Sequence, residues 1–188
     1  MTPGERLRLF VAADVPDDHL ARINELTSEL RARLHDARWT EPANQHVTLK
    51  FLGATLAEDL AGVTGVCAAV AAAHISAPIR FSGLGAFPGP RRARVLWMGI
   101  DDSDGLLQRL ATALDEGFRA LGFAPEDRPY TPHLTLGRLK SPASVADLLS
   151  VSVAVDSEPI TIDHLSLYRS RLSPRGAVYE QLGEFALA

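Results

Sequence analysis

The phrase His-x-Thr-Leu occurs twice in this chain, as HVTL at residues 46–49 and as HLTL at residues 133–136. Side chains two positions apart in a β-strand point to the same face of the sheet. Each copy therefore predicts a strand with an imidazole and a hydroxyl on its front, as in His46 and Thr48, and with apolar residues on its back. A polar front packs poorly into a core, so both fronts are expected to line a cavity.

The elements that precede the two copies also repeat. The buried strand RLRLFVAADVP (residues 6–16) and a helix over residues 18–35 come before the first copy. The strand ARVLWMGID (residues 93–101) and a helix over residues 107–121 come before the second copy. A further helix is predicted over residues 57–73, and short strands are expected to complete the chain.

This repetition predicts a duplicated unit. The expected fold is α+β and bilobal, with two mainly antiparallel sheets related by a pseudo-twofold axis and helices on the outer faces. Each lobe would contribute one His-x-Thr-Leu strand to a cleft between the lobes. Residues 1–188 would then form a single domain, because a chain of this length suits one domain with two small lobes.

Composition narrows the classes of protein that fit. The chain is 46% hydrophobic and 22% charged, which is typical of a soluble globular protein. Its net charge of −4 argues against a broad basic surface for long duplex nucleic acid. Cys67 is the only cysteine, so no internal disulfide and no cysteine-based zinc site can form. The N-terminus has no apolar run of signal-peptide length and the chain has none of membrane-spanning length, so we expect a cytoplasmic protein without membrane attachment.

Two imidazoles and two hydroxyls around one cavity suit acid–base chemistry on a phosphate. Histidine titrates near neutral pH, so His46 and His133 can act as a base and an acid in the same reaction. The hydroxyls of Thr48 and Thr135 can donate to phosphate oxygens without adding charge. A metal site built on the two histidines and nearby acids is a weaker alternative, because the neighbours within each motif are hydroxyls rather than carboxylates or thiolates. A module that binds nucleotides or RNA ends without turnover is the alternative from another class.

Five stretches resemble one family in the family's own order, from about residue 7 to residue 180. They are RLFVAADVP, HVTLKFLG, GLGAFPGPRRARVLWMGI, EDRPYTPHLTLGRLK and LYRSRLSPRGAVYE. On these motifs the chain resembles the two-histidine (2H) phosphoesterase superfamily, and specifically the RNA 2′,3′-cyclic phosphodiesterases, long called 2′-5′ RNA ligases.

The resemblance implies an enzyme that needs no metal or cofactor and hydrolyses a terminal 2′,3′-cyclic phosphate of RNA to a 2′-phosphomonoester, with 2′-5′ ligation as a related reaction. It implies that His46 is the proton donor and His133 the proton acceptor. Substrates would be RNA ends or nucleoside 2′,3′-cyclic phosphates. We expect a monomer with no obligate protein partner.

Three further residues are candidates for substrate binding. Arg138 matches an arginine of the family's second motif and could bind the phosphate. Strict alternation would put Arg138 on the face opposite His133, so a twist or bulge after Gly137 is needed to bring it to the front. Phe10 and Tyr130 are candidates for stacking on a base. Additional arginines that could guide RNA or face solvent are Arg91, Arg92, Arg94, Arg169 and Arg171.

Overall fold

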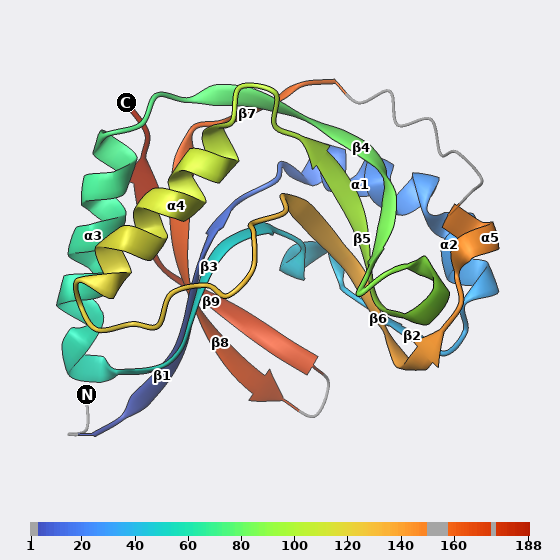
Figure 1. Cartoon of the computed structure of the whole chain (residues 1–188), viewed down its shortest axis with the longest axis horizontal. Coiled ribbons are helices and arrows are strands. Elements are labelled where there is room, and N and C mark those ends of the chain that lie inside the picture. Colours follow the sequence, from blue (N-terminus) through green and yellow to red (C-terminus); the bar gives the residue numbers. More distant parts are fainter. Residues whose placement is uncertain (1–3, 150–157, 174–175) are drawn as a thin grey trace.

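A computed structural model describes residues 4–149, 158–173 and 176–188 of the chain (Figure 1). The strands are β1 (Arg6–Ala13), β2 (Ala37–Trp39), β3 (Val47–Leu56), β4 (Ala77–Phe87), β5 (Ala93–Asp101), β6 (His133–Ala143), β7 (Ile160–Ile162), β8 (His164–Ser173) and β9 (Gly176–Ala186). The helices are α1 (Asp17–Leu26), α2 (Ser28–Arg33), α3 (Leu60–Ala72), α4 (Leu106–Arg119), α5 (Ala146–Leu149) and the 3-10 turns η1 (Pro42–Asn44), η2 (Ala57–Asp59) and η3 (Pro90–Arg92). Residues 174 and 175 of the last family-like stretch lie outside the described ranges.

The strands form one curled antiparallel sheet in the order β7-β4-β5-β6-β3-β1-β8-β9, and β2 adds to β6. This arrangement confirms the predicted α+β class. It also refines the expectation of two sheets, because the two sheets are halves of one. Within the described strands, β3 and β6 are joined by the pair Val47–Leu134, and both of these side chains are fully buried. Figure 1 shows the β1–β3–β8–β9 half to the left of this junction and the β4–β5–β6 half to the right.

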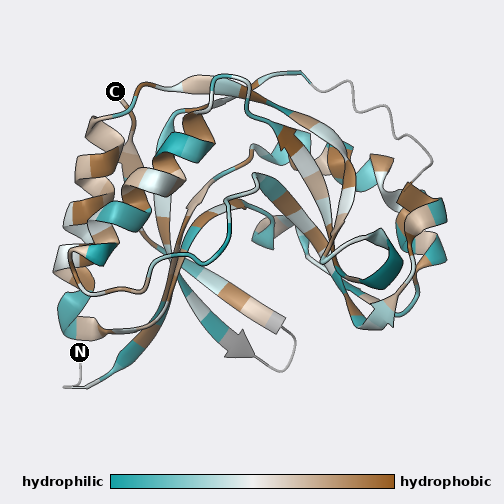
Figure 2. Ribbon diagram, in the orientation of Figure 1, coloured by the Kyte–Doolittle hydropathy of each residue, from teal (hydrophilic) through white to brown (hydrophobic). Residues whose placement is uncertain are grey.

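Helices α1, α2 and α4 each cover the half of the sheet that does not contain the strand before them in the sequence. Helix α4 follows β5 but packs with α3 against the left half, where Lys50 of β3 donates from Nζ to Asp115 of α4 at 2.7 Å. Figure 2 shows separate hydrophobic and hydrophilic patches along α4, and its buried residues include Leu106, Leu107, Leu110, Leu114 and Phe118. Helices α1 and α2 follow β1 but lie on the right-hand side of Figure 1.

This crossing follows from where β1 ends. Ala13, its last residue, pairs with Val47 at the junction of the two halves. A chain that leaves β1 there can pass directly onto the other half. A lobe therefore takes its strands and its helices from different parts of the sequence, and the duplication itself stays a prediction.

The predicted helix over residues 18–35 is in fact two helices, α1 and α2, which meet at Thr27. The Thr27 hydroxyl is buried and donates to the carbonyl oxygen of Ile23 at 2.8 Å. A threonine that bonds back to the preceding turn often bends a helix, which accounts for the break. Strand β2 was not predicted, because three residues are too few to show an alternating pattern.

Candidate functional site

The two His-x-Thr motifs face each other across the junction of the sheet. In an antiparallel pair, the Val47–Leu134 register places His46 opposite Thr135 and Thr48 opposite His133. Residues directly opposite have Cβ atoms roughly 4.5–5.5 Å apart. All four side chains are half-buried, whereas the intervening residues of both motifs are fully buried on the other face. The two imidazoles and two hydroxyls therefore gather around one spot.

Both motifs are followed by the same β-bulge. Leu136 is the extra residue in β6, because Thr135 pairs with Trp97 and Gly137 pairs with Leu96. Gly137 then faces the back, where the Trp39 ring would lie 2.9 Å from an added Cβ atom. The bulge turns Arg138 to the front as expected, but it lies at Leu136, before Gly137 rather than after it.

The first motif repeats this geometry. Leu49 is the extra residue in β3, because Thr48 pairs with Ala12 and Lys50 pairs with Val11. The bulges thus lie at matching positions, three residues after each histidine.

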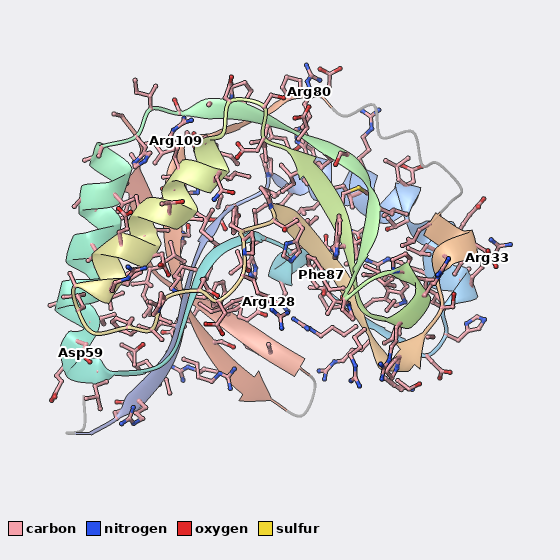
Figure 3. The ribbon with its side chains drawn as sticks, in the orientation of Figure 1. Arg33, Asp59, Arg80, Phe87, Arg109 and Arg128 are labelled. Atoms are coloured by element: carbon pink, nitrogen blue, oxygen red, sulfur yellow. The ribbon has the colours of Figure 1, made fainter. Side chains whose placement is uncertain are left out.

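The His133 ring is held in the form of a base. Its Nδ1 lies 2.7 Å from the carbonyl oxygen of Thr131, which can only accept, so Nδ1 carries the proton and Nε2 keeps its lone pair in the neutral ring. Burial lowers the pKa of His133, and the positive charge of Arg138 lowers it further against the opposing effect of the Thr131 bond. Phe87, which ends β4 and is labelled in Figure 3, meets the His133 ring edge-on at 5.1 Å between centroids.

The His46 ring lies in a different environment. It stacks on Phe10 at 4.7 Å between centroids and meets Tyr179 edge-on at 5.2 Å. Burial lowers the pKa of His46 to about 4, and the negative charge of Asp14 and a bond to the backbone of Asn44 oppose that shift. In the free protein His46 is therefore neutral near pH 7, and it needs an additional negative charge nearby to hold a proton.

Asp14 is the centre of a polar network that sequence reasoning missed. Its carboxylate accepts hydrogen bonds from Tyr168 at 2.8 Å, Ser166 at 2.5 Å and His164 Nε2 at 3.2 Å. His164 lacks a threonine two positions later and is not part of either His-x-Thr motif. Burial lowers the pKa of His164, but its bonds to Asp163 and Asp14 outweigh that effect and raise it. The position of Asp14, one residue after a buried strand that lies beside the first motif, was the available signal.

Comparison with known proteins agrees with this geometry. Residues 15–173 match the 2′-5′ RNA ligase superfamily. The chain belongs to this superfamily. A Methanothermobacter thermautotrophicus protein named RNA 2′,3′-cyclic phosphodiesterase is 33% identical over 97% of this chain and 100% of its own length. An Archaeoglobus fulgidus protein of the same name is 34% identical over 95% of this chain and 99% of its own length.

Solved structures have the same fold. A Thermus thermophilus protein superposes with a TM-score of 0.83 at 28% identity, covering 96% of this chain and 98% of its own. Escherichia coli LigT complexed with 3′-AMP superposes with a TM-score of 0.74 at 24% identity, covering 98% of this chain and 99% of its own, which is a likeness of fold.

Phe10, one of the two aromatic residues predicted to stack on a base, does not have a free face for that role in this member of the 2′-5′ RNA ligase superfamily. Phe10 is only 2% exposed, because His46 and Tyr168 lie against its ring. Tyr130 packs against the core, and its hydroxyl donates to the carbonyl oxygen of Thr48 at 3.1 Å. Phe10 thus supports the His46 ring, and Tyr130 ties the segment before β6 to β3.

Arg38 is a second cation beside Arg138 that sequence reasoning missed. The two residues are directly opposite in the β2–β6 pair, both are exposed, and neither forms an ion pair with an acidic side chain in the described part of the chain. Like charges placed directly opposite destabilise a sheet, so an anion between them would be favourable. The signal was weak, because Arg38 precedes Trp39 in a strand of three residues.

The other predicted arginines lie in different settings. Arg169 pairs with Glu5 at 2.8 Å and Arg171 pairs with Glu180 at 2.7 Å, so their charges are locally balanced. The arginines of the β4–β5 connection, Arg91, Arg92 and Arg94, are exposed.

Two absences complete the description of this superfamily member. In residues 4–149, 158–173 and 176–188, no three His, Cys, Asp or Glu side chains are arranged to hold a metal ion. Over the same ranges, no helix combines the length and apolar character needed to cross a membrane.

Proposed function

We propose that the chain is an RNA 2′,3′-cyclic phosphodiesterase that hydrolyses a terminal cyclic phosphate to a 2′-phosphomonoester. The observation that carries the proposal is the pair of histidines, each opposite the threonine of the other motif across one strand pairing. The names of the relatives at 33% and 34% identity support the same substrate. The alternative is a module that binds an RNA end in this site without turnover.

His133 acts as the general base in this proposal. Its free Nε2 takes a proton from a water molecule, and the water oxygen forms a bond to phosphorus. The bond from phosphorus to O3′ breaks, and His46 gives its proton to the departing O3′. The product carries the phosphate on O2′. An RNA 5′-hydroxyl that attacks in place of water would form a 2′-5′ linkage, which is the related ligation.

The remaining polar groups stabilise charge on the phosphate. The hydroxyls of Thr48 and Thr135 donate to the non-bridging oxygens, and Arg138 supplies positive charge from the β6 side. The substrate also prepares the acid. Its negative charge beside the buried His46 ring favours the protonated imidazole and raises the low pKa of the free protein.

Product analysis tests the proposal directly. The protein is incubated in EDTA with an oligonucleotide that ends in a 2′,3′-cyclic phosphate, and the product ends are identified. We expect complete conversion to 2′-phosphate at the rate seen without chelator, because both proton transfers are assigned to side chains. A double His46→Ala, His133→Ala variant prepared in parallel controls for contaminating nucleases. Activity that disappears in EDTA and returns with a divalent ion would contradict the mechanism, and binding without turnover would support the alternative.

A further inference from the structure

Arg8, Ser170 and Tyr179 form a row across three neighbouring strands, on the face of the sheet that carries the catalytic groups. Arg8 of β1 is directly opposite Ser170 of β8, and Ser170 is directly opposite Tyr179 of β9. Directly opposite residues in an antiparallel pair have their side chains on the same face. The Tyr179 ring meets the His46 ring edge-on at 5.2 Å between centroids, so the row lies beside the proposed acid.

Alternation along β1 gives the same direction for the Arg8 side chain. Phe10 stacks on His46, and the β1–β8 register runs without a shift from Arg8 to Ala12. Residues two apart in a strand share a face, which puts Arg8 on the front with Phe10. A strand rises roughly 3.3 Å per residue, so Arg8 lies about 6.6 Å along β1 from Phe10. Arg8 is therefore close to the site, on its β1–β8 side.

The charge of Arg8 is not balanced by a neighbouring acid. Its side chain is exposed, and it forms no ion pair within the described residues. The nearby acids are paired with other arginines. Glu5 pairs with Arg169 at 2.8 Å, and Glu180 pairs with Arg171 at 2.7 Å. An isolated exposed arginine is common on protein surfaces, but here the fold holds an unpaired guanidinium beside a site for a polyanion.

Tyr179 adds a hydroxyl to this cation. Burial raises the pKa of Tyr179, and the positive charges of Arg138 and Arg8 oppose that rise, so both guanidiniums lie near the phenol. The Tyr179 hydroxyl has no hydrogen bond to the described part of the chain, whereas the Tyr168 hydroxyl is bonded to Asp14. A free hydroxyl beside two cations suits a phosphate, because the hydroxyl can donate to an oxygen while the guanidiniums supply charge.

The chemistry of the substrate indicates which phosphate this row would meet. In the proposed mechanism the ribose lies on the His46 side, because its O3′ must reach the acid. In an RNA chain, O5′ of the same ribose carries the phosphodiester that joins it to the preceding nucleotide. That phosphodiester is a second anion, and it leaves the site on the side of the ribose, where Arg8 and Tyr179 lie.

Resting on the proposed phosphodiesterase function, we propose that Arg8 and Tyr179 bind the phosphodiester on the 5′ side of the terminal nucleotide. Arg8 supplies positive charge, and the Tyr179 hydroxyl donates to a non-bridging oxygen. A free nucleoside 2′,3′-cyclic phosphate has no group to place there. The row therefore makes the protein selective for the end of an RNA chain over the corresponding mononucleoside.

Steady-state kinetics with and without the second phosphate tests this site. The substrates are adenosine 2′,3′-cyclic phosphate, the same compound with a phosphate on O5′, and a dinucleotide that ends in the cyclic phosphate. The variants are Arg8→Gln, which removes the charge, and Tyr179→Phe, which keeps the ring beside His46 and removes the hydroxyl. Arg33→Gln is the matched control, because Arg33 is an exposed arginine of α2 at the outer edge of the other half of the sheet (Figure 3). Thermal unfolding of each variant checks folding.

The parent should have a kcat/KM roughly 10- to 100-fold higher for the two substrates with a second phosphate, the range for a hydrogen bond to a charged group. Arg8→Gln should abolish most of this advantage, and Tyr179→Phe should reduce it roughly 2- to 10-fold, as for a neutral hydrogen bond. The advantage should shrink as salt is added, because the groups are exposed. Arg8→Gln should change kcat/KM for adenosine 2′,3′-cyclic phosphate by less than about threefold, since an exposed charge acts weakly on a group that it does not touch. Arg33→Gln should keep the full advantage.

Three results would overturn the proposal. One is an equal kcat/KM of the parent for substrates with and without the second phosphate. Another is an equal loss on all three substrates in Arg8→Gln, which would mean that Arg8 acts on the cyclic phosphate. The third is loss of the advantage in Arg38→Gln but not in Arg8→Gln, which would place the preceding phosphodiester over β2.

A parent protein without turnover of any of the three substrates would defeat the proposed function instead. In that case, titration of adenosine 2′-monophosphate and adenosine 2′,5′-bisphosphate into the parent and Arg8→Gln still decides the role of Arg8. Only the bisphosphate should bind more weakly to the variant. Equal affinities of the parent and the variant for the bisphosphate would overturn the proposal.

Discussion

The surroundings of His46 and His133 differ although their backbone frames match. His133 begins β6 and His46 immediately precedes β3, and each strand has its bulge at the leucine of its motif. Both imidazoles contact aromatic rings, but the Asp14 carboxylate lies near His46, whereas the positive charge of Arg138 lies near His133. The repeated frame positions two equivalent imidazoles, and the neighbours that are not repeated distinguish them.

This difference bears on which histidine is the acid. A nearby cation disfavours imidazolium, so Arg138 keeps His133 in the neutral form that a base needs. A nearby carboxylate favours imidazolium, so Asp14 partly offsets the cost of burial at His46. The charges of Asp14 and Arg138 therefore support the proposed assignment of His46 as donor and His133 as acceptor, whereas the burial of His46 opposes it.

The largest predicted loss of activity comes from substituting either histidine by alanine. His46→Ala and His133→Ala should each lower kcat roughly 10²- to 10⁴-fold, the range for general acid–base catalysis. A substrate whose leaving oxygen needs no proton should rescue His46→Ala and leave His133→Ala inactive. Rescue of His133→Ala instead would mean that the roles are reversed.

The next largest loss of activity is expected from removing the charge of Arg138, the cation near His133. Arg138→Gln should lower kcat/KM for a cyclic phosphate roughly 10- to 100-fold, as expected for a lost hydrogen bond to a charged group. Arg38→Gln, in the opposite strand, should cost less on a mononucleotide and reduce the salt dependence of RNA binding. Equal, negligible losses in both variants would show that this pair of arginines faces away from the phosphate.

The threonines should respond equally, because the frame places them symmetrically. Thr48→Val and Thr135→Val keep the shape of the side chain and remove the donor. Each should reduce kcat by about tenfold or more, corresponding to a transition-state hydrogen bond of at least ~1.4 kcal/mol. A tenfold loss in one variant and none in the other would show that only one hydroxyl reaches the phosphate.

The smallest effect is a displacement of the pH–rate profile. Asp14→Asn removes a charge that favours the protonated His46, so the alkaline limb of the kcat profile should move to lower pH while the acidic limb, set by His133, stays in place. In the parent protein, the alkaline limb of kcat should lie at higher pH than that of kcat/KM, because the bound phosphate raises the pKa of His46. Tyr168→Phe serves as a control, since it removes one hydrogen bond to Asp14 and leaves the charge. An acidic limb that moves instead would link Asp14 to His133.

Part of the site could be predicted from the chain because it depends on local alternation. The spacing of His46 and Thr48 places both on one strand face in any sheet, and the same holds for the second copy. Strand alternation alone puts Arg138 on the face opposite His133, so its place in the site could be predicted only if the strand contained a twist or bulge. That bulge depends on which residues of β5 pair with β6. Phe10 was correctly placed in the first strand, but its burial against His46 and Tyr168 could not be predicted, since that burial depends on β8 and β9, which lie far along the chain.

By itself, the sequence determined the α+β class, the two strands that carry the catalytic groups, and the pair of histidines, because each follows from periodicity and residue type within a few positions. Only the tertiary structure decided which residues lie beside those histidines. Arg38 lies opposite Arg138 because of the cross-strand register and the β-bulge at Leu136, and a shift of one residue would turn either side chain to the opposite face. Asp14 meets Ser166 and Tyr168 because β1 pairs with β8. The position of α1 and α2 on the β4–β5–β6 half was likewise decided by where β1 ends, at the junction that Val47 and Leu134 form.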